Sequence, residues 1–189
     1  MRSSVVVALV VAAGLTLAAC GSSTKASSPT STTKVDVLSS PTWEKAGPNP
    51  SLSAKMVCQK EAATDIAASV GIQQTRVTPF TWMPAMHILS CTYVYPKGKI
   101  TVFVKEMSSE KETTAYFDMI TKKYGTTQAL QGIGQGAWLL KNNDLVARKD
   151  YKVLLIDVSG IPAKFAPLMT RSDVALNFGV AIMNCWTGD

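Results

Sequence analysis

ILSCTYVYPKGKITVFVK, residues 88–105, is the stretch of this 189-residue chain that decides its fold class. Apolar and polar residues alternate in the runs 88–95 and 100–105, as in strands with one buried face. A sequence typical of tight turns, PKGK at 96–99, separates the two runs. So short a connection requires antiparallel pairing. We therefore expect a central hairpin whose second strand buries Ile100, Val102 and Val104.

Three segments with helical periodicity flank this hairpin. The first spans 53–70 and ends at Gly71. The second starts with a capping box at Ser109 and ends at Gly125, and the third starts at Ser172. Their buried stripes are expected to hold Met56, Ala63, Ile66, Ala67 and Val70, then Tyr116, Met119 and Ile120, and finally Val174, Phe178, Ala181, Ile182 and Cys185.

Further strands are expected before the hairpin and after the second helix. A short strand ends at Val77 and leads into a loop, while the runs 127–130, 137–141, 144–149 and 151–158 form a meander of three or four strands. The order is thus helix, strands, helix, meander, helix. We predict an α+β fold, an antiparallel sheet with helices packed on one face.

The N-terminus carries a targeting signal. An apolar run from Val5 to Ala19 follows a single cation, Arg2, and is too short to span a membrane permanently. It ends in Leu17-Ala18-Ala19-Cys20, which resembles the lipobox of bacterial lipoproteins at all four positions. The resemblance implies that residues 1–19 are a signal peptide and that Cys20 is acylated. It also implies a lipid-anchored protein on the extracytoplasmic face of the cell membrane.

Residues 20–52 are expected to be a disordered tether behind the lipidated cysteine. Between Gly21 and Leu52 there are 13 Ser/Thr and four Pro, with Trp43 as the only aromatic residue. Such a composition buries too little apolar surface to offset the entropy of ordering the chain. We expect residues 53–189 to form a single globular α+β domain.

The charge of the chain is modestly basic, with a formal net charge of +6. From residue 53 onward, 15 Lys/Arg accompany 11 Asp/Glu. The cations are scattered, which is typical of solvated surface and not of a nucleic-acid site. We therefore expect no nucleic-acid partner. The expected partners are the membrane, through the lipid anchor, and either an envelope protein or an apolar ligand.

Three cysteines remain besides Cys20. Outside the cytoplasm they can form one disulfide, and we expect Cys58–Cys91, which would join the first helix to the hairpin. Cys185 is either a small buried side chain on the last helix or the partner of Cys58 or Cys91. No Cys-x-x-Cys spacing is present and His87 is the only histidine, so we expect no metal site.

Residue types suited to catalysis are present without the spacing that catalysis needs. His87 has no nucleophile at contact distance along its strand and is expected to be structural. Asp157 interrupts a strand and is expected to be solvated or to cap its end. The stretch GIGQGA, residues 132–137, fits the dinucleotide fingerprint but leads into a strand, where a helix would be required. We expect neither enzymatic activity nor a cofactor.

The apolar stretch PFTWMPAM, residues 79–86, is the best candidate for a functional surface. Two prolines stiffen it. Folded back on the domain, it would cover one end of the core. Exposed, it would bind a partner through anchoring aromatic and adaptable methionine side chains. These candidate recognition residues are Phe80, Trp82, Met83 and Met86.

Several features together resemble small actinobacterial cell-envelope lipoproteins of unknown function, many of them mycobacterial. Besides the lipobox they are Cys58 early in the first helix, Cys91-Thr92-Tyr93 on the central strand, the glycine-rich segment 132–138 and the closing amphipathic helix. The resemblance spans the whole chain and implies that Cys58 and Cys91 form a disulfide. It transfers no catalytic residue.

Three functional hypotheses follow. The first is a non-enzymatic binding or accessory module, tethered to the membrane, that recognises an envelope protein. The second is a carrier for a lipid or another small apolar ligand, with a cavity between helices and sheet. The third is an envelope hydrolase that uses carboxylates such as Asp157.

Overall fold

A computed structural model describes residues 41–166 and 168–187 of the chain. The signal peptide, Cys20 and residues 21–40 of the expected tether lie outside the described residues. The quoted stretch forms the hairpin of β3 (Ile88–Tyr95) and β4 (Gly98–Glu106). Its turn requires glycine, because a Cβ added at Gly98 would lie 2.3 Å from the Gly160 carbonyl oxygen.

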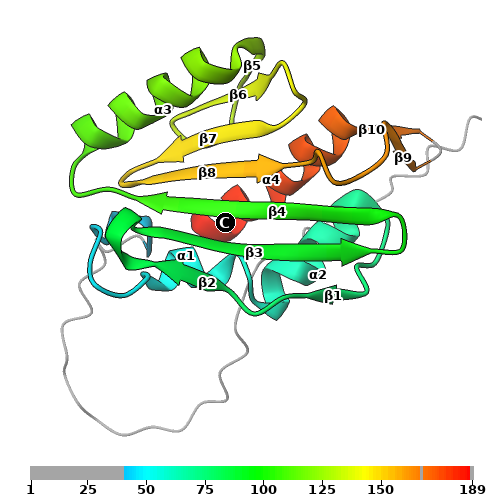
Figure 1. Cartoon of the computed structure of the whole chain (residues 1–189), viewed down its shortest axis with the longest axis horizontal. Coiled ribbons are helices and arrows are strands. Elements are labelled where there is room, and N and C mark those ends of the chain that lie inside the picture. Colours follow the sequence, from blue (N-terminus) through cyan, green and yellow to red (C-terminus); the bar gives the residue numbers. More distant parts are fainter. Residues whose placement is uncertain (1–40, 167, 188–189) are drawn as a thin grey trace, which may run out of the picture.

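The hairpin lies in the middle of an eight-stranded sheet (Figure 1). The strand order is β1-β3-β4-β8-β7-β6-β5, with β2 also paired to β3, and every pair is antiparallel. The meander returns to the hairpin where β8 pairs with β4. The other strands of the sheet are β1 (Arg76–Val77), β2 (Thr81–Met83), β5 (Thr126–Leu130), β6 (Gly136–Leu140), β7 (Leu145–Lys149) and β8 (Lys152–Asp157).

Within the described residues, the α-helices that accompany the sheet are α1 (Leu52–Met56), α2 (Lys60–Val70), α3 (Glu110–Tyr124) and α4 (Arg171–Thr187). The first expected helix is thus two helices, because Gln59 adopts an extended conformation and starts a second one. Helix α1 starts one residue before the expected position 53, and Ser51 caps it by accepting a hydrogen bond from the Ala54 amide. Gly71 ends α2 in the left-handed conformation, as expected.

The helices lie on both faces of the sheet, where one face was expected. Strand alternation sends Leu154 and Ile156 into the core with α1, α2 and α4, and we call this the inner face. Val153 points the other way and packs with Phe117 and Ile120 of α3, on what we call the outer face. The α+β class and the antiparallel sheet with helices are confirmed. The position of α3 differs because strands β6 to β8 also carry apolar residues on their outer side.

Three local details also differ from expectation. Met119 of α3 is exposed, since Phe117 and Ile120 supply the contacts with the sheet. Thr170, not Ser172, caps α4, because its hydroxyl accepts a hydrogen bond from the Asp173 amide at 3.3 Å. An additional short hairpin precedes that helix, made of β9 (Lys164–Ala166) and β10 (Met169–Thr170). The expected buried side chains of α4 are confirmed.

Residues 42–52, which we call the N-terminal strap, pack on the domain. Thr42 is fully buried, and its hydroxyl donates a hydrogen bond to the Asp150 carboxylate. The Ala46 amide donates to the Met107 carbonyl at 2.9 Å. The folded part of the chain therefore starts by residue 42, before the expected boundary. Composition suggested disorder, but these polar groups find specific partners on the sheet.

Candidate functional site

The expected recognition segment lies along the outer edge of β3 (Figure 1). Its middle is the short strand β2, in which Trp82 pairs with Leu89 of β3. The 3-10 turn η2 (Pro84–Met86) follows. His87 ends this turn in the left-handed conformation, with φ of 48°, and its amide donates to the Pro84 carbonyl at 3.2 Å. The segment expected to be a loop is therefore an ordered edge strand followed by a tight turn.

Its four candidate residues divide into two pairs. Phe80 and Met86 are 44% and 48% exposed, whereas Trp82 and Met83 are half-buried. Trp82 packs against the core. The segment therefore covers the edge of the core and also presents two large apolar side chains to solvent.

Trp82 fixes the segment to the N-terminal strap. Its indole Nε1 donates a hydrogen bond to the Pro48 carbonyl at 3.0 Å. Its ring stacks on His87, with the ring centroids 6.1 Å apart. The only histidine of the chain thus supports an aromatic side chain, consistent with the structural role expected for it.

Lys105 holds the other end of the segment. Its ammonium group donates a hydrogen bond to the Met86 carbonyl and also lies over the ring of Tyr116, 5.9 Å from the ring centroid. The next residue, Glu106, donates its amide to the His87 carbonyl at 2.9 Å. Partial burial lowers the pKa of Lys105 from its ordinary value. The backbone that carries Met86 is therefore held in place from β4.

A shallow groove of about 100 Å³ lies beside this lysine on the outer face. Sites that bind drug-sized molecules usually measure about 300–1,000 Å³. A groove of this size suits a single apolar side chain of a partner better than a cofactor. Its walls come from α3 and from strands β3, β4 and β8, through Ile88, Phe103, Lys105, Tyr116, Ile120, Val153 and Leu155.

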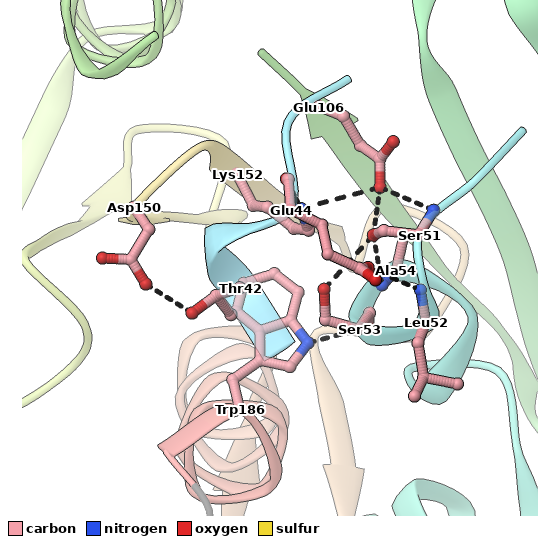
Figure 2. A network of polar contacts seen from close by, with 10 residues as sticks. All are labelled: Thr42, Glu44, Ser51, Leu52, Ser53, Ala54, Glu106, Asp150, Lys152 and Trp186. Carbon is pink, nitrogen blue, oxygen red and sulfur yellow. Dashed lines mark hydrogen bonds and ion pairs between the residues drawn. The ribbon is translucent and has the colours of Figure 1, made fainter. Parts of the chain in front are cut away.

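A buried ion pair lies where β4 and β8 meet on the inner face (Figure 2). Lys152 Nζ is 3.7 Å from Glu106 Oε1, and both side chains are fully buried. Lys152 also donates to the backbone carbonyl of Glu44 in the strap at 2.6 Å. Burial lowers the pKa of Lys152, and the nearby Glu106 carboxylate opposes that shift.

Ser51 completes this network from the strap. Its amide donates to Glu106 Oε1 at 3.0 Å, and its hydroxyl also donates to the same oxygen. The hydroxyl oxygen accepts the hydrogen bond from the Ala54 amide that caps α1. Glu106 Oε2 has no hydrogen-bond partner among the described residues. Because the charged groups are closed off from solvent, the network can hold the strap in place but offers no access to a substrate.

Sequence reasoning missed this network, although one signal was present. Glu106 continues the alternation of Ile100, Val102 and Val104, which places it on the inner face. Lys152 opens the alternating run of β8 in the same way. The pattern could have indicated two inward charges. It contained nothing to indicate that the strap would cover them.

The cysteines follow the expectation. Cys58 and Cys91 form a disulfide that joins the chain between α1 and α2 to β3. Cys185 is buried and free of disulfide bonding, and its thiol lies 3.3 Å from Asp65 Oδ2. The alternative pairing of Cys185 with Cys58 or Cys91 is therefore wrong.

The residues considered for catalysis remain apart from one another. Asp157 is half-buried at the end of β8, where its carboxylate accepts a hydrogen bond from the Ser159 amide at 2.8 Å. This is the capping role expected for it. Gly132 and Gly134 adopt positive φ and lead into β6, as expected of a bend before a strand. Within 41–166 and 168–187, no three His, Cys, Asp or Glu side chains are grouped to hold a metal.

Comparison with known proteins gives no relative: no family model, curated protein or solved structure matches the chain. In the part of the chain that the structure describes, none of the helices has the length and apolarity to cross a membrane.

Proposed function

We propose that this protein is a non-enzymatic binding module, anchored by lipid to the extracytoplasmic face of the cell membrane, that recognises an envelope protein through residues 80–86. One observation carries the proposal. Phe80 and Met86 are exposed, yet the backbone between them is fixed through β2, Trp82 and Lys105. Exposed apolar side chains on an ordered backbone lose little entropy when a partner covers them.

The second part of the proposal is the lipid anchor near the N-terminus. The Leu17-Ala18-Ala19-Cys20 motif is the sequence feature that motivates it. Metabolic labelling with a palmitate analogue should label the wild-type protein and not a Cys20→Ala variant. An unlabelled wild-type protein that retains Met1 would remove the basis for the location.

The carrier alternative receives less support. A carrier would need a cavity between the inner face and its helices. Phe178 of α4 instead packs edge-to-face on Tyr93 of β3, with ring centroids 5.2 Å apart, and Trp186 of the same helix donates its indole N–H to the Ser53 carbonyl at 2.9 Å. All three side chains are fully buried.

Partner recognition can be tested by crosslinking in cells, with a photoreactive amino acid in place of Met86. Met119 on α3 is the matched control, because the two methionines are 48% and 47% exposed. We expect a discrete crosslinked protein from position 86 that is absent from position 119 and lost when Phe80→Ser is added. Equal crosslinking at both positions, or none at 86, would contradict the proposal.

A further inference from the structure

The N-terminal strap carries two exposed apolar side chains close to the start of the described chain. Trp43 is 54% exposed and Leu52 is 56% exposed. The two lie in one neighbourhood, because the carboxylate of Glu44 accepts a hydrogen bond from the Leu52 amide at 2.9 Å. A neighbouring tryptophan and leucine in solvent are typical of an interaction surface.

The strap is built so that these two side chains stay outside. Thr42 and Ser51, the residues next to them, are buried and hydrogen-bonded to Asp150 and Glu106 (Figure 2). These buried neighbours hold the backbone in place next to Trp43 and next to Leu52. A small movement of the strap would therefore not bury Trp43 and Leu52 in the core.

The length of chain before the strap indicates what covers this surface. Only residues 21–40 separate Cys20 from Pro41, where the described chain begins. A segment of this length spans at most about 70 Å even when fully extended. A lipid on Cys20 would therefore keep Trp43 and Leu52 within about that distance of the bilayer.

The charges beside the two apolar residues suit an anionic lipid surface. Lys45 is exposed, with its ammonium group 5.6 Å from the centroid of the Tyr151 ring. Lys55 lies in the last turn of α1. The one acidic residue of the strap, Glu44, bonds to the Leu52 amide. Tryptophan at the head-group level, a neighbouring leucine and flanking lysines are the groups that interfacial protein surfaces use.

We infer that Trp43 and Leu52 dock the domain on the lipid bilayer, with Lys45 and Lys55 toward anionic head groups. This inference rests on the proposed lipid anchor. It deepens the proposed function, because the Trp82–Pro48 hydrogen bond joins the recognition segment to the strap. The recognition segment would then bind its envelope protein close to the membrane surface.

The test uses the full lipidated protein, purified in detergent and reconstituted into vesicles of phosphatidylcholine with a minority of phosphatidylglycerol. Flotation first reports whether the protein is anchored. Lipids with brominated acyl chains then quench any tryptophan that enters the bilayer interface. Trp43 is the most exposed of the four tryptophans, so Trp43→Phe should reduce the quenching by roughly twofold or more.

Leu52→Ser keeps Trp43 as the fluorescent reporter and removes the proposed apolar contact of Leu52 with the bilayer. It should therefore weaken the quenching while the protein still floats. Met119→Ser, an exposed site on α3, is the matched control and should change neither readout. Protein that floats without being quenched, or quenching that Leu52→Ser leaves unchanged, would overturn the docking inference and leave the anchor intact. Protein that does not float would overturn the anchor and the inference together.

Discussion

The two faces of the sheet differ in how completely they are covered. On the inner face, α1, α2 and α4 bury the alternate residues of all the long strands, including Val104, Leu154 and Ile156. On the outer face, α3 covers the β6–β8 half, while Ser90, Thr92 and Phe103 on the hairpin half remain partly exposed. The inner face thus supplies the stability of the domain. The hairpin half of the outer face and the adjoining edge of β3 are less completely covered.

The inner face also carries the features that constrain the chain most strongly. The disulfide joins β3 to the segment between α1 and α2, and the hydroxyl of Tyr93 donates to the Val57 carbonyl beside it. Burial raises the pKa of this tyrosine well above its ordinary value. The buried ion pair lies at the end of the same face under the strap. The disulfide, the buried ion pair and the buried tyrosine therefore all lie on the inner face, where the helices exclude water.

The largest expected contrast is between two phenylalanines. Phe178 on the inner face is fully buried against Tyr93, whereas Phe117 on the outer face is 6% exposed with the Arg148 guanidinium over its ring. Phe178→Ala should lower the free energy of unfolding by about 3–5 kcal/mol, and Phe117→Ala should lower it by less, because fewer helices pack on the outer face. Urea unfolding measures both. Equal losses would show that the faces contribute alike.

The second contrast separates charge from packing on the inner face. Lys152→Met leaves the Glu106 carboxylate buried without its cation and should cost about 3 kcal/mol. Adding Glu106→Leu removes that unpaired charge, so the double variant should regain much of the loss. Urea unfolding of the single and double variants measures how much of the lost free energy of unfolding comes from the unpaired carboxylate of Glu106. A double variant less stable than Lys152→Met would contradict this explanation.

The third prediction concerns the turn between β6 and β7, where one carboxyl group should make the free energy of unfolding depend on pH. Asp144, in the turn between β6 and β7, has a pKa raised from 3.8 to about 6, mainly by burial. The folded state therefore holds a proton that the unfolded state releases. The free energy of unfolding should fall by roughly 2 kcal/mol as the pH rises from about 4 to about 6. Asp144→Asn should flatten this slope, and an unchanged slope would assign it to another group.

The smallest expected effect comes from adjacent residues of β4 that point to opposite faces. Phe103 lines the groove and is half-buried, whereas Val104 is fully buried. Phe103→Ala should cost about 1 kcal/mol, less than the roughly 2 kcal/mol expected for Val104→Ala, although more atoms are removed. Thermal and urea unfolding of the two variants decide the order. A larger loss at Phe103 would indicate that this part of the outer face is structural.

Much of the sheet could be predicted because its signal is local. The alternation in 88–105, the PKGK turn and the spaced strands of the meander each depend on neighbouring residues. The disulfide was also within reach, since few cysteines were available to pair. The side of the sheet on which α3 packs was missed. That choice depends on apolar residues of β6 and β8, far from the helix in sequence.

The candidate site could be predicted only in part for the same reason. The apolar stretch at 79–86 was evident, but its division into two covering and two exposed side chains depends on pairing with β3 and on Pro48. The strap was missed altogether. Thr42, Ser51 and its two prolines are residue types typical of a disordered tether. The strap gains partners only where Asp150, Glu106 and Lys152 come together.

By itself, the sequence determined the class of the fold, the general order of its helices and strands and the inward face of the hairpin's second strand, because periodicity and turn chemistry act over a few residues. Tertiary structure alone decided that helices cover both faces and that two inward charges meet. It also decided that residues 42–52 close over them. These outcomes depend on contacts between residues far apart in the sequence, 108 positions for Glu44 and Lys152 and 133 for Ser53 and Trp186, which no local pattern encodes.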